Sequence, residues 1–286
     1  HMIGKGEPGR RDGSFRSSEF SMPQGILWDR DRIYVADTGN HLVRVADLNR
    51  GEVSTMAGTG EKGRYVKEGF VGVPLTTSIN SPWDLALLKD RLFIAMAGFN
   101  QIWYLDLKKR RLGPFAGTGH ENITDGEFYD AEFAQPSGIS ISGNDIFIAD
   151  SEASAVRSIS LKEKFVSTLT GSGLFIYGDK DGDLGNSRMQ HPLGIDAHGD
   201  FLYVADTYNS AVKEINIRDK TVMTLVGAKS HSVCRFDDPE CDTLGLYEPS
   251  DVKLNGKKLY IVDTNNNMVR IFDLETKLLD TLKLVR

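Results

Sequence analysis

The chain has 286 residues, but it holds only two cysteines, Cys234 and Cys241, and no long apolar run. Two cysteines are too few for a disulfide-rich scaffold or a structural zinc site, and the pair can be either bridged or free. The longest nearly apolar segment, residues 92–98, is far shorter than the roughly 18 residues of a membrane-spanning helix. No signal peptide is visible, and His1-Met2 resembles a cloning remnant. We therefore expect a cytoplasmic protein with no membrane partner.

Positive charge is also in short supply. Lysine and arginine together number 34 against 40 acidic residues, which gives a net charge of −6. This balance argues against a protein whose main task is to bind a nucleic-acid backbone. Helix-like patterns are scarce, and 29 glycines indicate many turns. The composition is that of a soluble, globular and turn-rich protein.

The strongest pattern in the sequence is an internal repeat. Each copy begins with a proline that is followed, three residues later, by an aliphatic residue, and the intervals between copies are 59, 54, 56 and 57 residues. The five prolines are Pro23, Pro82, Pro136, Pro192 and Pro249. A period this regular predicts five copies of one structural unit.

Each copy contains short β-branched and aromatic segments separated by Gly, Asn and Asp. A continuous apolar strand ends in Asp in four copies, whereas the second copy, at 93–96, ends in Met. Four short strands per tandem repeat are typical of a β-propeller, in which neighbouring blades bury one another's faces. We predict an all-β propeller of five four-stranded blades over residues 23–286. Residues 1–22 form a tag remnant and a lead-in that resembles the end of a preceding blade.

The count of five blades leaves an alternative open, namely a six-bladed parent from which one blade is missing. If the ring is incomplete, its closure depends on packing between the first and last blades or on a second copy of the chain. Self-association is then an expected consequence.

A cation follows the strand-ending Asp by seven residues in four copies, at Arg44, Arg157, Lys213 and Arg270. We expect each pair to bridge turn and strand within its blade. In the intervening Asp-Thr-x-Asn turn, the Asn side chain bonds nearby backbone and tolerates a positive φ. We interpret these repeated residues as structural.

The same segments resemble a known repeat. Pro-Leu-Gly-Ile at 192–195, followed by Tyr-Val-Ala-Asp-Thr at 203–207, and Val-Asp-Thr-Asn-Asn at 262–266, are similar to the NHL repeat over nearly the whole chain. The resemblance implies a six-bladed propeller, and in some members a thioredoxin-like domain precedes it. No segment of these 286 residues resembles that domain, which is a candidate partner within a longer parent chain.

Function is expected on the face that carries the long links between blades, because long loops on a rigid scaffold are where binding usually occurs. The second copy is unusual there, since Met96 to Asn100 replaces the Asp-Thr-x-Asn turn near Trp83 and Trp103. We predict a non-enzymatic scaffold for a protein or peptide, without a cofactor. The candidate binding residues are His41, Trp83, Phe99, Asn100, Gln135, His191, Tyr208, Glu248 and Asn267.

Two other functions remain open. Asp84, Asp251 and His191 form a candidate catalytic set for a cation-dependent lyase or lactonase in the central channel. RNA binding by the loop face is the second alternative, but the basic run 108–111 falls on a turn of the other face. The acidic segment 179–183 lacks EF-hand spacing, so a turn is expected there instead of a calcium site. No metal site is predicted.

Overall fold

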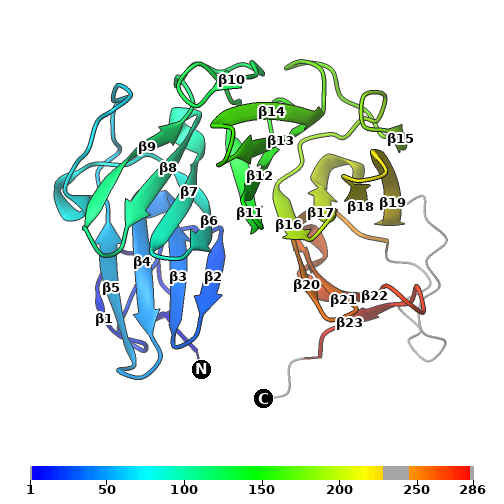
Figure 1. The fold of residues 1–286 in the computed structure, drawn as a ribbon. Helices are drawn as coiled ribbons and strands as arrows, with labels where there is room; N and C mark the ends of the chain where they lie inside the picture. Colours follow the sequence, from blue (N-terminus) through cyan, green and yellow to red (C-terminus); the bar gives the residue numbers. More distant parts are fainter. Residues whose placement is uncertain (1, 228–244, 284–286) are drawn as a thin grey trace. The chain divides into compact units, whose positions relative to one another are not determined.

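A computed structural model describes residues 2–227 and 245–283. The described residues form two compact units, one of residues 2–141 with 163–166 and one of residues 142–162 with 167–227 and 245–283. The repeats form antiparallel sheets throughout, so the protein is an all-β propeller of five blades (Figure 1). This confirms the fold class expected from the repeat. Cys234 and Cys241 lie outside the described residues.

The first blade lies in the first unit and consists of five strands in the order β1-β5-β4-β3-β2. Its elements are β1 (Gly13–Ser14), β2 (Ile26–Asp29), β3 (Arg32–Asp37), the 3-10 turn η1 (Thr38–Asn40), β4 (Leu42–Asp47) and β5 (Glu52–Ala57). The continuous apolar run of β3 suits its central place in the sheet, where both faces are covered.

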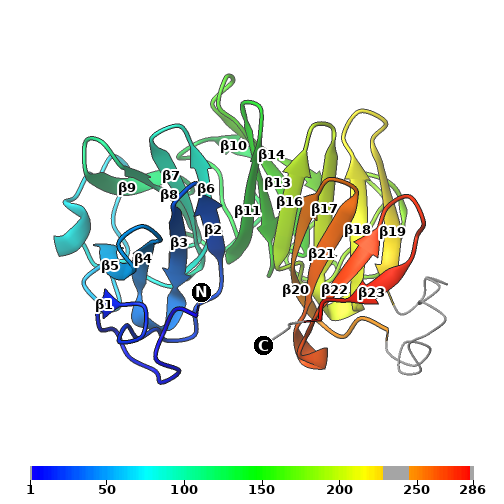
Figure 2. The same cartoon turned by 90° about the horizontal axis from the view of Figure 1, so that it is seen from below.

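The second blade has the order β6-β7-β8-β9 and also lies in the first unit. It follows the short turn η2 (Pro74–Thr76) and consists of β6 (Pro82–Leu88), β7 (Arg91–Met96), η3 (Ala97–Phe99), β8 (Gln101–Asp106) and β9 (Arg111–Ala116). Strand β3 of the first blade contacts β6 of the second, and both views place these sheets side by side (Figure 2).

The third repeat supplies strands to both units. They are β10 (Gly126–Glu127), β11 (Pro136–Ser142), β12 (Asp145–Asp150), β13 (Ala155–Ser160) and β14 (Phe165–Thr170). In the first unit Gly126 of β10 pairs with Val166 of β14. In the second unit β12 pairs with β13 along its whole length.

The fourth and fifth blades lie in the second unit. The fourth consists of β15 (Gly182–Asp183), β16 (Gly194–His198), β17 (Phe201–Asp206), η4 (Thr207–Asn209), β18 (Ala211–Asn216) and β19 (Thr221–Gly227). The fifth consists of β20 (Pro249–Asn255), β21 (Lys258–Asp263), η5 (Thr264–Asn266), β22 (Met268–Asp273) and β23 (Leu279–Thr281).

The short strands β1, β10 and β15 were not expected from the sequence. Each contains the Gly of an Asp-Gly pair, and each adds a fifth strand to the outer edge of its blade. The pattern predicted only a turn at these places, because a two-residue strand has no periodicity of its own. These strands cover part of the outer edge, which would otherwise offer unpaired backbone groups.

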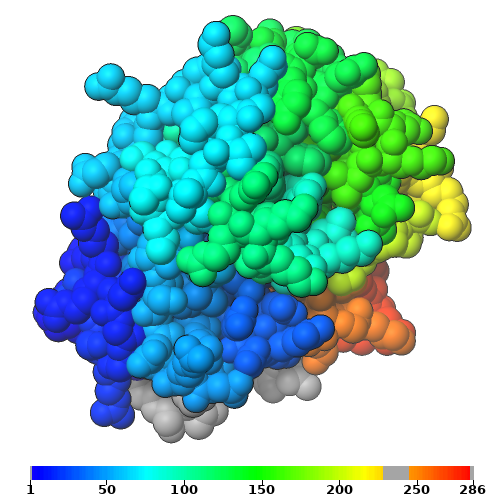
Figure 3. Space-filling model, turned by 60° about the vertical axis from the view of Figure 1, so that its left-hand side comes forward, coloured from blue at the N-terminus to red at the C-terminus, as the bar shows by residue number. Residues whose placement is uncertain are grey.

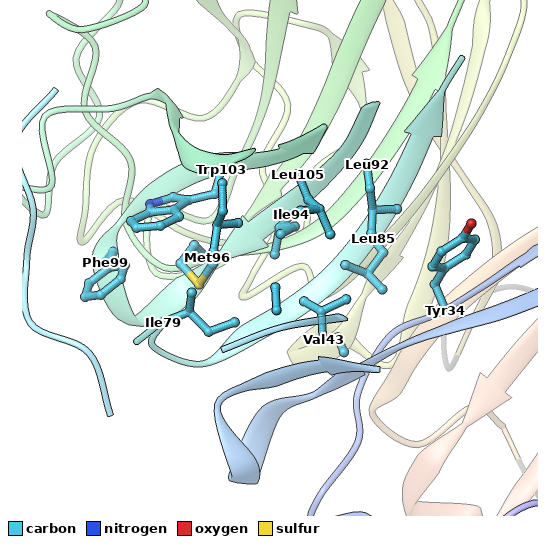
Figure 4. Close-up of a cluster of buried hydrophobic side chains, with 13 residues drawn as sticks. Tyr34, Val43, Ile79, Leu85, Leu92, Ile94, Met96, Phe99, Trp103 and Leu105 are labelled. Carbon is cyan, nitrogen blue, oxygen red and sulfur yellow. The ribbon is translucent and has the colours of Figure 1, made fainter. Parts of the chain in front are cut away.

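The hydrophobic core is made where one blade packs on the next. In the first unit, Val43 of the first blade lies with Leu85, Ile94 and Trp103 of the second (Figure 4). In the second unit, Tyr203 and Val212 of the fourth blade pack with Ile261 of the fifth. Each blade thus buries its apolar faces against its neighbour within the unit, as the repeat logic requires.

Candidate functional site

The loop face is built on the turns η1, η3, η4 and η5, each of which joins the second strand of a blade to the third. Every such turn ends in a left-handed residue whose N–H bonds the first carbonyl of the turn, as His41 N bonds Thr38 O at 3.1 Å. The left-handed residues of these four turns are His41, Asn100, Ser210 and Asn267, and Ser154 closes the corresponding turn of the third repeat in the same way. A positive φ was expected at the preceding Asn of the turn, and this expectation is wrong by one position.

A second series of left-handed residues stands directly before the repeat prolines. Met22, Ser81, Gln135, His191 and Glu248 have φ between 45° and 55° although none is glycine. L-residues rarely adopt this conformation, so the surrounding structure must impose it. The sequence gives no signal for it, because the five side chains differ in type.

Hydrogen bonds between the two series hold neighbouring blades together. In the first unit His41 Nδ1 accepts the Ser81 N–H at 3.1 Å, and Asn100 Oδ1 accepts the Gln135 N–H at 3.0 Å. Burial lowers the pKa of His41, which suits a neutral imidazole acting as acceptor. His41 and Asn100 therefore have a structural task beside any binding role.

The same device recurs in the second unit. Ser154 Oγ accepts the His191 N–H at 3.2 Å, and Ser210 Oγ accepts the Glu248 N–H at 3.3 Å. Three different side-chain types thus act as the acceptor at four equivalent positions. The left-handed position at the end of the turn therefore requires a short side chain that accepts a hydrogen bond, but it does not require one residue type.

The predicted ion pair beneath the turn is present in the first blade. Arg44 is fully buried, and its guanidinium bonds Asp37 at 2.9 Å and Asp12 at 2.7 Å. It also donates to the carbonyls of Glu19 and Arg11, each at 3.0 Å. Arg44 therefore fastens the incoming link to the turn.

In the fourth blade, a lysine takes the place of this arginine. Lys213 Nζ bonds Asp179 and Asp181, each at 2.8 Å, but it stays 3.9 Å from Asp206. Burial of the Asp206 carboxyl raises its pKa to about 7, because the Lys213 ammonium group is too far away to offset the loss of solvation. Asp179 and Asp181, which belong to the acidic segment resembling a calcium loop, bind the ammonium group of Lys213.

The second blade replaces this ion pair with apolar packing. Met96 stands in the place of the Asp and Trp103 in the place of the Arg, and both are fully buried. The Trp103 ring stacks on Phe99 with ring centroids 5.3 Å apart (Figure 4). Its Nε1–H donates to Gln101 Oε1 at 2.9 Å. Phe99, a predicted binding residue, is only 4% exposed, and Trp83 is half-buried.

In the second unit, the predicted residues His191 and Tyr208 form a stacked pair. Their ring centroids lie 4.4 Å apart, and Glu152 reaches His191 Nδ1 at 3.7 Å. Burial lowers the pKa of His191 more than this carboxylate raises it. Glu248 accepts a hydrogen bond from Asn265 at 2.7 Å, whereas Gln135 and Asn267, each in its own unit, are exposed.

The two candidate catalytic carboxylates differ in their contacts. Asp84 is buried and accepts the Ile139 N–H at 3.0 Å, so it serves the backbone of the next blade. Asp251 lies 3.9 Å from Lys253, and burial raises the pKa of its carboxyl despite this cation. Over residues 2–227 and 245–283, no group of three or more His, Cys, Asp or Glu side chains is arranged to hold a metal ion.

Sequence reasoning missed several exposed aromatic residues of the links. Phe175 is 88% exposed and Tyr177 is 60% exposed, in the link that leads into the fourth blade. Tyr65, in the link between the first two blades, is 54% exposed. The available signal was the apolar run 174–177 between two glycines, which is out of place in a solvated loop.

The first unit also has a hollow of about 460 Å³ away from these turns. Arg32, Arg50 and Arg110 line it together with Asp47, Glu52 and Asp106. The charges balance, and Arg50 lies 3.9 Å from Asp47. The hollow therefore carries no preference for an ion of either sign. In the described part of the chain, no helix is long and apolar enough to cross a membrane.

Comparison with known proteins gives consistent relatives. Residues 193–228 match the family model of the LVIVD repeat. The chain is 39% identical over 325 aligned residues to NHL repeat-containing protein 2 of Homo sapiens, covering all of this chain and 43% of that protein. It is 36% identical to Protein SUPPRESSOR OF QUENCHING 1, chloroplastic, of Arabidopsis thaliana, covering 94% of this chain and 26% of that protein. The chain thus spans less than half of either relative.

Among solved structures, the fold resembles a chain in the nidogen/laminin complex, with a TM-score of 0.64, 17% identity and coverage of 94% of this chain and 82% of that one. It also resembles streptogramin B lyase, with a TM-score of 0.54, 13% identity and coverage of 93% and 70%. At these identities the likeness concerns the fold alone.

Proposed function

Since the chain belongs to the NHL-repeat β-propellers, we propose that it is a non-enzymatic scaffold whose loop face binds a protein or peptide. The observation that carries this proposal is the exposure of large aromatic side chains on the links of the second unit. Clustered exposed apolar side chains mark interaction surfaces, and tyrosine is enriched in them. The whole activity of the longer relatives is not transferred.

The backbone connects several of these side chains into one surface. Asn209 Nδ2 donates to Gly178 O at 2.7 Å, which holds the residue after Tyr177 against the turn that carries Tyr208. Tyr208 is 54% exposed and stacks on His191. We define Phe175, Tyr177, Tyr208 and His191 as the aromatic surface of the second unit. Glu152 adds a carboxylate beside it.

Other parts of the proposal concern the partner and its location. A thioredoxin-like domain, which the family resemblance offers, is one protein partner to test on this surface. We retain a cytoplasmic location as part of the proposal, although one relative is named chloroplastic. A channel enzyme is less favoured, because Asp84 already binds the Ile139 N–H and Asp251 lies near Lys253.

The experiment is a selection of displayed peptides on the immobilised chain, followed by affinity measurements on the selected peptides. We expect the double variant Phe175→Ser/Tyr208→Ser to weaken binding at least about tenfold, since exposed aromatic anchors commonly carry 1–2 kcal/mol or more each. Phe201→Ser is the matched control, because Phe201 is a partly exposed aromatic at the opposite end of β17. Equal binding by the double variant, or loss of binding on adding a chelator, would overturn the proposal.

A further inference from the structure

The second blade lacks one hydrogen bond that three other blades make on the loop face. In three blades the Asn of the turn donates its amide to a carbonyl of the incoming link. The pairs are Asn40 to Gly9 at 2.7 Å, Asn209 to Gly178 at 2.7 Å and Asn266 to Gly245 at 2.9 Å. In the second blade this position is Phe99, and in the third it is Ala153, so neither side chain has a donor. Only the second blade fills the position with an aromatic ring.

Gly63 is the link residue that corresponds to Gly9 and Gly178. The Gly63 N–H bonds Ile79 O, two residues before the left-handed Ser81, at 2.9 Å. Gly9 bonds Phe20 O and Gly178 bonds Met189 O in the same way, two residues before Met22 and His191. The Gly63 carbonyl therefore lies where the other blades place an acceptor for the turn amide.

No described residue donates a hydrogen bond to this carbonyl. The Phe99 ring occupies the space of the missing amide, since a Cβ on Gly63 would lie 2.9 Å from the ring edge. A backbone acceptor beside an aromatic ring is thus left for a partner from outside. The second blade therefore combines two changes: Met96 and Trp103 replace the buried ion pair, and Phe99 leaves a hydrogen-bonding position open.

A cavity of about 300 Å³ lies at this place, within the first unit. Gly63, Tyr65, Asn80, Phe99 and His120 line it, together with two further glycines. This volume is at the lower end for ligand pockets, which suits one large side chain better than a drug-sized molecule. In Figure 3 the link around residues 60–70, pale blue on the bar, stands out at the surface.

The groups around the cavity decide what it can take. Tyr65 rests on Gly119, where a Cβ would lie 2.4 Å from the ring, yet the residue stays half exposed. Asn80 is committed, since its Nδ2 donates to Gly98 O at 2.8 Å and its Oδ1 accepts from the Ser81 hydroxyl at 3.2 Å. The cavity therefore offers aromatic surface, the exposed imidazole of His120 and a backbone acceptor, the Gly63 carbonyl. An aromatic ring with a single donor complements the aromatic surface and this acceptor.

We propose that this cavity binds the side chain of a tryptophan or tyrosine in a partner peptide, with the indole N–H or phenol O–H donated to the Gly63 carbonyl. The inference rests on the proposed function, of which it names a partner feature. It concerns the first unit, whereas the aromatic surface that carries the proposed function belongs to the second. The two can therefore fail separately.

The test follows the backbone amide signals of the isotope-labelled chain by NMR during titration with N-acetyl-tryptophanamide. We expect shifts centred on Gly63, Gly98 and Gly119. The 1-methylindole analogue and N-acetyl-phenylalaninamide lack the donor, and we expect each to bind about fivefold more weakly, as the loss of one hydrogen bond implies. Equal binding of the three probes, or no shift at millimolar concentration, would refute the inference.

Variants separate the carbonyl from the apolar wall. Phe99→Asn restores the amide of the other blades, which should occupy the Gly63 carbonyl and abolish binding, whereas Phe99→Leu should keep the acceptor open and retain it. Tyr65→Ala removes a half-exposed ring and should weaken binding even if Phe99→Asn fails to fold. Unchanged affinity in Tyr65→Ala would also refute the inference. If the probes fail to bind while the selected peptides still lose affinity in Phe175→Ser/Tyr208→Ser, this inference is refuted and the proposed function is unaffected.

Discussion

The first two blades place the same turn above two different interiors. Turns η1 and η3 have equal length, and each closes with a left-handed residue bonded to the first carbonyl of the turn. Beneath η1 lies the buried pair Asp37 and Arg44, whereas beneath η3 lie Met96 and Trp103. The backbone geometry of the turn is therefore independent of the chemistry below it.

This comparison agrees with what is known of buried ion pairs. The Coulombic gain of such a pair is largely offset by the desolvation of its two charges, so well-packed apolar residues can replace it at little cost. The replacement does remove the hydrogen bonds that hold the link, since Arg44 in the first blade also bonds Asp12 and two link carbonyls. In the second blade Asn80 takes over part of this task by bonding Gly98 O.

The largest effect is expected when the arginine is placed alone into the second blade. Trp103→Arg removes a fully buried ring and buries a cation without a carboxylate at position 96. Loss of the aromatic packing and the unpaired charge should together cost about 5 kcal/mol or more of unfolding free energy. Urea unfolding monitored by circular dichroism measures this loss.

The double variant Met96→Asp/Trp103→Arg sharpens the comparison. It recreates the pair of the first blade, so it should be more stable than Trp103→Arg alone by about 1–3 kcal/mol of coupling energy. If adding Met96→Asp to Trp103→Arg restores no stability, the interiors of the first two blades are not interchangeable.

A smaller loss is expected when the first blade loses its carboxylate. Asp37→Ala leaves Arg44 buried, and it also removes the acceptor of the Ser21 N–H. We expect a cost of about 3–5 kcal/mol, softened by the contact of Arg44 with Asp12, and thermal unfolding measures it. Asp12→Ala is the control, because Asp12 is half exposed and should cost less. An equal loss from both variants would contradict a buried pair as the main stabilising contact.

The repeat period and the strand-ending Asp were sufficient to predict five all-β blades and the ion pair, because both depend on contacts local to one repeat. The edge strand β1 was not predictable, since Gly13 and Ser14 gain their pairing only from the position of β5. The left-handed Gln135 was hidden for a similar reason, as the acceptor of its N–H is Asn100 of the previous blade. The cavity beside Phe99 could not be predicted, because it depends on where the link places Gly63. The sequence did show that Phe99 is unusual at its position in the repeat.

The smallest effect concerns the lysine variant of the same pair, in the fourth blade. The pKa of Asp206 is raised to about 7 by burial, whereas in the unfolded chain it is close to 4. Between about pH 4 and pH 7, Asp206 is protonated in the folded state but ionised in the unfolded state. The stabilisation from Asp206 is therefore full below about pH 4, is lost as the pH rises to about 7, and is constant above that.

Urea unfolding between pH 4 and 8 measures this slope, which should amount to about 1–3 kcal/mol over the range, as about 1.4 kcal/mol per pKa unit allows. Asp206→Asn cannot titrate and should remove the contribution. Lys213→Arg should reduce it, because a forked guanidinium can reach both the link carboxylates and Asp206, as Arg44 does in the first blade. If Asp206→Asn keeps the slope of the unaltered chain, another group titrates, and the 3.9 Å separation between Lys213 and Asp206 has no energetic consequence.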